Sequence, residues 1–73
     1  MALYLENKGK VFFRNGLPSS IFWQPEVLNN DVTPDDLQNQ ADAELRVCGF
    51  RVKVGEVKFE EDNQVLFARV WWQ

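Results

Sequence analysis

The sequence contains no histidine and only one cysteine, Cys48, among its 73 residues. A single cysteine excludes a disulfide within the chain, and without histidine a closed zinc or iron–sulfur site has too few ligands. Histidine is also the commonest general base near neutral pH, so its absence removes the usual starting point for catalysis. We therefore expect no metal and no cofactor.

The remaining nucleophiles and carboxylates do not form a pattern typical of an active site. Ser19 and Ser20 have no histidine to activate them, and the sequence has no nucleophile elbow, phosphate-binding loop or dinucleotide fingerprint. Cys48 falls at the C-terminal end of a predicted helix, where the dipole disfavours a thiolate, so we expect it in the core. The adjacent Asp35 and Asp36 are typical of a helix start. We expect that the protein is not an enzyme, and we infer no small-molecule substrate.

No apolar run approaches the ~20 residues of a membrane-spanning helix, and the first residues lack the basic region and apolar core of a signal peptide. Together with the free cysteine, this favours a cytoplasmic location. The length predicts one domain over residues 1–73, and a domain of this size buries only about 60% of its unfolded surface. Because disulfides and metals are excluded, association with another chain is the stabilisation that remains.

The composition is that of a globular protein, but its charge is unevenly distributed. Hydrophobic residues make up 45% and charged residues 26%, which argues against disorder. The net charge is −3, and all charged residues from position 26 to 44 are acidic: Glu26, Asp31, Asp35, Asp36, Asp42 and Glu44. Such a stretch is usually a solvated surface. The alternative is an acidic patch that selects a basic partner, although its charges are sparse for a nucleic-acid mimic.

The N-terminal residues predict a β-hairpin, because apolar residues alternate on both sides of a loop at 7–9 that ends in glycine. The expected pairs are Leu5 with Val11, Leu3 with Phe13 and Tyr4 with Phe12. Asn15 and Gly16 indicate a second turn, after which residues 21–23 can form a third strand. Because Pro18 has no N–H to donate, we expect that segment at a sheet edge or as an irregular return.

Residues 33–48 predict a helix of about four turns. Thr33 can cap its first turn, Asp42 and Arg46 have the spacing of an exposed ion pair, and Gly49 is a natural terminator. The apolar side chains fall within about 80° of one another on a helical wheel. That stripe consists of Leu37, Ala41, Leu45 and Cys48.

Residues 50–72 predict a second hairpin with a bulge. Apolar residues occupy even positions before Gly55 and odd positions after it, so one extra residue at Gly55 restores a single apolar face. A tight turn at Gly55 is the alternative. An even-numbered loop within 61–64 keeps the apolar rows together, whereas an odd loop would bury Arg69. The expected core face consists of Val52, Val54, Val57, Phe59, Leu66, Ala68, Val70 and Trp72.

The strand at 65–72 is apolar on both faces, since Phe67 and Trp71 alternate with the residues of the core face. Tyr4 and Phe12 give the first hairpin a second aromatic face as well. One helix cannot cover both faces of a sheet, and exposed apolar patches of a few hundred Å² mark interaction sites. The alternative is that residues 19–23 or the long loop cover these rings.

We therefore predict an α+β fold, with an antiparallel sheet of four to five strands and the helix packed on one face. The expected function is that of a protein–protein interaction module that acts by stoichiometric binding, as a homodimer or as an accessory or inhibitor-type binder of a larger protein. The small size and acidic balance fit the general profile of accessory proteins of bacteriophages or mobile elements. The predicted contact residues are Phe67, Arg69 and Trp71, with Tyr4, Phe12 and Trp23 as extensions.

A single-stranded nucleic-acid-binding protein is the alternative function. Phe67 and Trp71, with Arg69 between them, have the composition of a base-stacking sheet surface. The basic residues expected beside them are Arg51, Lys53 and Lys58. Against it, Glu56 and Glu60 share the same face and the whole chain is acidic. Aromatic residues with arginine are also typical of protein contact surfaces.

Overall fold

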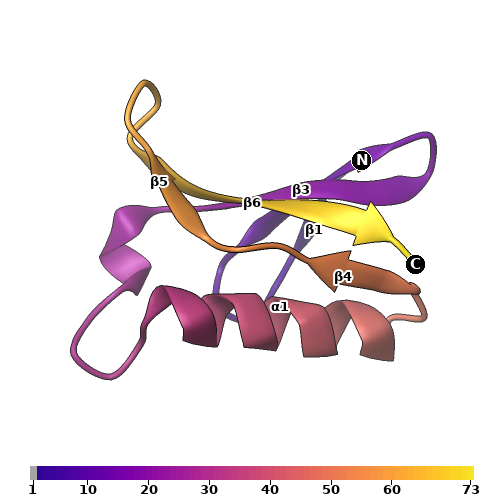
Figure 1. Cartoon of the computed structure of the whole chain (residues 1–73), viewed down its shortest axis with the longest axis horizontal. Helices are drawn as coiled ribbons and strands as arrows, with labels where there is room; N and C mark the ends of the chain where they lie inside the picture. Colours follow the sequence, from indigo (N-terminus) through magenta and orange to yellow (C-terminus); the bar gives the residue numbers. More distant parts are fainter. Residues whose placement is uncertain (1) are drawn as a thin grey trace.

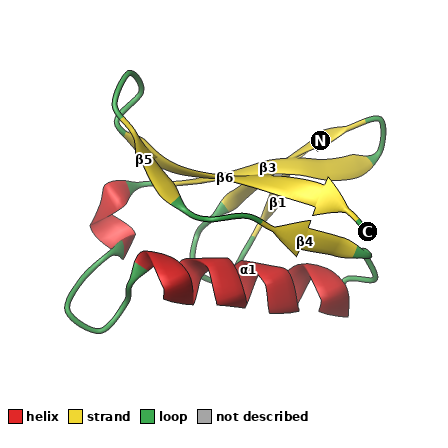
Figure 2. Cartoon of the chain, in the orientation of Figure 1, coloured by secondary structure: helices red, strands yellow, loops and turns green. Residues whose placement is uncertain are grey.

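The computed structural model describes residues 2–73, which form an antiparallel sheet of six strands with one α-helix packed on one face (Figures 1 and 2). The predicted α+β class is confirmed. The order across the sheet is β1-β2-β3-β6-β4, and β5 also pairs with β6. The elements are β1 (Ala2–Tyr4), β2 (Lys10–Arg14), β3 (Leu17–Trp23), the 3-10 helix η1 (Pro25–Val27), α1 (Pro34–Val47), β4 (Val52–Val54), β5 (Lys58–Glu60) and β6 (Val65–Trp72).

Helix α1 begins and ends where its sequence signals predict. The Thr33 hydroxyl oxygen accepts from the Asp36 N–H at 3.2 Å, and the Asp36 carboxylate accepts from the Thr33 N–H at 2.9 Å, which completes a capping box. Asp42 and Arg46 form the expected ion pair at 3.1 Å. Gly49, with φ +97°, ends the helix. Local sequence therefore determines both boundaries.

Cys48 is the exception on the predicted stripe of α1. Leu37, Ala41 and Leu45 are buried, whereas Cys48 is exposed. The prediction of a core cysteine is therefore wrong. Cys48 is the C-cap residue, so it lies where the chain leaves the helix, and the neighbouring Phe50 packs against the core instead. The stripe that contacts the sheet is one residue shorter than the helical wheel indicates.

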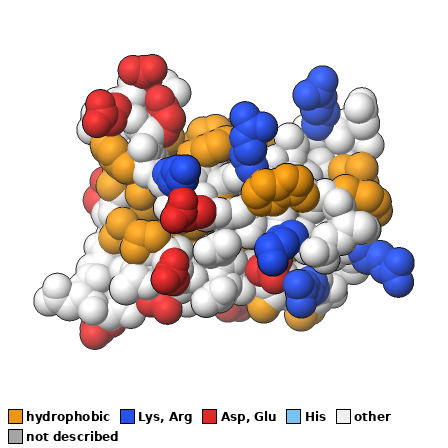
Figure 3. Space-filling model, viewed as in Figure 1, with side chains coloured by type: hydrophobic (Ala, Val, Ile, Leu, Met, Phe, Trp, Pro, Cys, Tyr) orange, Lys and Arg blue, Asp and Glu red, His pale blue; other side chains and the backbone are white. Residues whose placement is uncertain are grey.

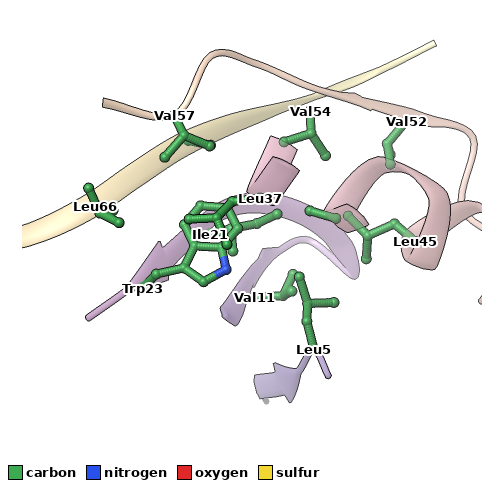
Figure 4. Close-up of a cluster of buried hydrophobic side chains, with 12 residues drawn as sticks. Leu5, Val11, Ile21, Trp23, Leu37, Leu45, Val52, Val54, Val57 and Leu66 are labelled. Carbon is green, nitrogen blue, oxygen red and sulfur yellow. The ribbon is translucent and has the colours of Figure 1, made fainter. Parts of the chain in front are cut away.

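The core lies between α1 and the sheet (Figure 4). α1 also hydrogen-bonds to the sheet margin, because the Gln38 side-chain amide donates to the Val54 carbonyl and the Asp42 carboxylate accepts from the Val54 N–H, both at 3.1 Å. The helix thus covers one face and hydrogen-bonds the backbone of β4. The buried residues are Leu5, Val11, Ile21, Trp23, Leu37, Ala41, Leu45, Val52, Val54, Val57, Leu66 and Ala68.

Trp23 belongs to this core. Its side chain is 1% exposed, and its indole N–H donates to the Asn7 side-chain oxygen at 3.0 Å. The prediction that Trp23 extends the partner-binding surface is therefore wrong. Strand parity gives the reason, since Ile21 and Trp23 share the face of β3 that packs towards α1, while Phe22 points to the other side.

The first hairpin forms with a register that differs from the predicted one. The observed pairs are Ala2 with Phe12, Leu3 with Val11 and Tyr4 with Lys10. The left-handed residue of the turn is Lys8, with φ 69°, rather than Gly9. Since the partners change by two positions, each side chain keeps its predicted face.

Gly9 has a packing role instead of a turn role. A Cβ atom at position 9 would lie 2.4 Å from the indole nitrogen of Trp23. The Gly9 N–H donates to the same Asn7 oxygen that accepts from the indole. The glycine therefore allows Trp23 to lie directly against the backbone of the hairpin turn.

Replacing Gly9 with alanine is expected to lower the free energy of unfolding by about 1–3 kcal/mol, because the added methyl group overpacks a fully buried indole. Urea denaturation followed by circular dichroism measures the change. Gly16→Ala is the control. A Cβ atom at position 16 would meet open space, so the only cost is that of an alanine in the left-handed conformation, φ +80°. That cost is expected to lower the free energy of unfolding by about 1 kcal/mol. An alanine at position 9 that leaves stability unchanged would contradict the close contact with Trp23.

Strand β3 is central in the sheet, between β2 and β6, so the predicted edge position is wrong. Pro18 pairs only with Phe13 of β2, and the ladder with β6 begins at Ser20. A register shift beside Phe13 accommodates the irregular start of the strand. The proline is thus tolerated because it lies outside the ladder with β6, which ends at the pair of Ser20 and Arg69.

The predicted bulge at Gly55 is confirmed. Val54 pairs with Val70 and Lys58 pairs with Phe67, so three residues of one strand lie opposite two residues of the other. The Gly55 N–H donates to the Arg69 carbonyl at 2.8 Å. The loop between Glu60 and Val65 has an even number of residues, as predicted. Of the predicted core face, Val52, Val54 and Val57 are buried. Phe59 and Trp72, which lie at opposite ends of that face, are exposed.

Candidate functional site

In residues 2–73, no helix or loop packs over the sheet face opposite α1, which we call the open face (Figure 1). The pairing of the strands brings together on it residues that are distant in the sequence. The open face consists of the side chains of Tyr4, Lys10, Phe12, Arg14, Ser20, Phe22, Lys53, Glu56, Lys58, Glu60, Val65, Phe67, Arg69 and Trp71.

Aromatic rings form a contiguous row across the centre of the open face. Phe22 and Phe67 are cross-strand partners with ring centroids 5.0 Å apart, and Phe12 meets Phe22 edge-on at 5.3 Å. The Lys10 ammonium lies 5.0 Å from the Phe12 centroid and 5.8 Å from that of Tyr4. A shallow groove of about 480 Å³ lies at this end of the face. The row is therefore a packed apolar surface edged by a lysine.

Trp71 forms the other end of the aromatic surface. Its side chain is 53% exposed, and a Cβ at Gly55 would lie 2.5 Å from its ring. A second groove, of about 220 Å³, separates Trp71 from Phe67 and is also lined by Arg69. The glycine that permits the bulge thus also leaves room for the indole.

Gly55→Ala is expected to move the exposed Trp71 ring and to lower the free energy of unfolding by about 1 kcal/mol. The ring can rotate into solvent, but the Arg69 carbonyl oxygen, 3.3 Å from the added Cβ, has to shift slightly. NMR of the Trp71 indole N–H, with urea denaturation in parallel, measures both effects. The buried Trp23 indole resonance serves as the internal control and is expected to stay in place. A stability loss as large as that of Gly9→Ala would show that Trp71 is held rigidly.

Charge is divided unevenly between the two sides of the molecule. The open face holds five of the eight basic residues, Lys10, Arg14, Lys53, Lys58 and Arg69, and two of the eleven acidic ones, Glu56 and Glu60. Figure 3 shows basic and hydrophobic side chains intermixed over the β4 and β6 region, with acidic ones at the β5–β6 loop and mainly at the lower left of the view. The open face is therefore basic in an acidic protein.

The structure brings together five of the six predicted contact residues. Tyr4, Phe12, Arg69 and Trp71 are exposed on the open face and Phe67 is half-buried there, whereas Trp23 is in the core. Sequence reasoning missed Phe22 and Lys10, which lie between these residues. Strict alternation of Ile21, Phe22 and Trp23 could have placed Phe22, had the strand been recognised as central.

The predicted acidic patch lies on the elements that do not form the open face. Asp36 is used in the capping box, and Asp42 binds both Arg46 and the Val54 N–H. Glu26, Asp31 and Asp35 are exposed on η1, the following loop and the start of α1. Part of this acidic stretch therefore stabilises the fold, and the remainder gives the helix side its negative charge.

Within the described residues, no group of three or more His, Cys, Asp or Glu side chains is arranged to hold a metal ion. No helix between positions 2 and 73 has the length and apolarity needed to cross a membrane. A scan against protein-family models and searches of curated proteins and of solved structures gave no match. The candidate site therefore has to be interpreted from its own geometry and charge.

Proposed function

We propose that the protein is a protein-binding module that acts by stoichiometric contact through the open face. The observation that supports this most strongly is the row of aromatic rings that no described element covers. Tyr4 is 65% exposed and Trp71 is 53% exposed, in a chain whose stability margin is thin. Burial of about 100 Å² on each such ring would contribute roughly 2–3 kcal/mol before the costs of association.

The chemistry of the open face is typical of protein contact surfaces. Trp, Tyr and Arg are the residues most enriched at binding hot spots, and Trp71, Tyr4 and Arg69 are all exposed here. The two grooves beside the rings can accept side chains of a partner. Together these features favour a partner that inserts apolar side chains.

Single-stranded nucleic acid is the second candidate ligand, favoured by the five basic residues of the open face. The ring geometry supports it less well. Phe12, Phe22 and Phe67 meet at interplanar angles of 89° and 54°, so they do not form a flat stacking platform, and Lys10 lies over Phe12. Fluorescence titration with oligo-dT at two salt concentrations tests this ligand, since its affinity would fall steeply with salt.

The proposed function is tested by mapping where a selected peptide binds. Peptides from a random 12-residue library, selected against the immobilised protein, provide the ligands. We expect their addition to shift amide resonances of β2, β3 and β6, centred on Phe67 to Trp71, and to leave α1 unchanged. Shifts confined to α1, or the absence of any selected peptide, would contradict the proposal.

A further inference from the structure

We infer that the partner presents an acidic as well as apolar surface to the open face, and that it is a different protein rather than a second copy bound face to face. The inference rests on the proposed function and specifies its partner. Five basic and two acidic residues give the open face a net charge of +3. The other three basic and nine acidic residues give the remainder −6.

The two acidic residues of the open face are already engaged within the chain. Glu56 forms an ion pair with Lys58 at 3.5 Å. Both carboxylate oxygens of Glu60 accept from the backbone of its own turn, at 3.1 Å from the Asp62 N–H and 2.7 Å from the Asn63 N–H. In contrast, among residues 2–73 no carboxylate forms an ion pair with Lys10, Lys53 or Arg69. Within the same residues Arg14 forms no ion pair either, so four of the five basic residues of the open face are left for a partner.

The positions of these cations relative to the rings specify the partner further. Lys10 is the cross-strand neighbour of both Tyr4 and Phe22, and Lys53 is that of Trp71. Directly opposed side chains on a sheet have Cβ atoms about 4.5–5.5 Å apart. A side chain that contacts a ring therefore lies within reach of an ammonium group. The surface matches carboxylates interleaved with apolar residues, as on an acidic protein surface.

Self-association through the open face fits this charge distribution poorly. A symmetric dimer would place two faces of net charge +3 against each other, and like charges brought together at an interface are unfavourable. Contact between the open face of one copy and the acidic helix side of another would be complementary in charge. However, that contact is head-to-tail, so it produces chains or rings rather than a closed pair. A separate acidic protein avoids both problems.

The composition of selected peptides tests the inference. We expect 12-residue peptides selected from the random library against the wild-type protein to be enriched in Asp and Glu next to apolar residues. Arg69→Gln, which removes a charge between Phe67 and Trp71, is expected to weaken their binding fivefold or more at low salt. Arg46→Gln is the matched control, because it removes the same charge from α1, and we expect a change of less than twofold.

The other outcomes would overturn the inference in distinguishable ways. Neutral apolar peptides whose binding depends on Trp71 but not on Arg69 would overturn the acidic partner and retain the proposed function. Peptides that bind independently of both residues would overturn both. Oligo-dT that binds more tightly than every selected peptide would replace the protein partner with nucleic acid. A molar mass that rises with concentration in light scattering would identify a second copy as the partner.

Discussion

Trp23→Ala is expected to lower the free energy of unfolding by about 3–5 kcal/mol, the range measured when a large buried aromatic side chain is truncated. Trp23 is 1% exposed, contacts the backbone at Gly9, and donates its indole N–H to Asn7. A domain of this size has a total stability of only several kcal/mol. We therefore expect the variant to be largely unfolded at 25 °C, as measured by circular dichroism and urea denaturation.

Trp23→Phe is the control for this result. It retains an aromatic ring in the core but removes the indole N–H, while the Asn7 oxygen still accepts from the Gly9 N–H. A smaller loss than that of Trp23→Ala is expected, because less volume is removed and no polar group is left without a partner. If Trp23→Ala were as stable as the wild type, the side chain could not be part of the core.

The faces of the strands could be predicted from the sequence because they depend only on parity. The first hairpin illustrates this, since Leu3 with Val11 and Tyr4 with Lys10 replace the predicted pairs without moving any side chain to the other face. At Gly55 the change of parity predicted the bulge itself. Cross-strand partners, by contrast, depend on the geometry of the turn, which the sequence pattern does not determine. The packing role of Gly9 could not be predicted either, because it depends on contact with Trp23, which is 14 residues away in the sequence.

The composition of the candidate site could be predicted only in part, because it depends on which strands are neighbours. The sequence predicted the pairing of β4 and β5 with β6. It therefore also predicted that Phe67 and Trp71 lie close to lysines of the neighbouring strands. The sequence did not predict the central position of β3, because Pro18 favours the edge of a sheet. That position brings Phe22 into contact with Phe67 and joins β2 to the same surface. The basic character of the open face therefore emerges only from the assembled sheet.

Trp71→Ala is expected to weaken the binding of the selected peptides thirtyfold or more, which corresponds to about 2 kcal/mol and is typical of a tryptophan hot spot. Trp71 stands at the end of the aromatic surface, beside the groove that Phe67 and Arg69 also line. Because its side chain is more than half exposed, we expect its loss to change the free energy of unfolding by about 1 kcal/mol or less. Titration calorimetry and urea denaturation measure the two quantities.

The adjacent Trp72 provides the matched control. It is 56% exposed, and it pairs with Val52, so its side chain points to the helix side of the sheet rather than to the open face. Trp72→Ala removes the same side chain from the neighbouring position, and we expect peptide affinity to change less than threefold. Equal losses for both variants would assign binding to the exposed end of β6 rather than to the open face. A Trp71→Ala variant that unfolds would show that the Trp71 ring stabilises the sheet, and Trp71 would then be a structural rather than a binding residue.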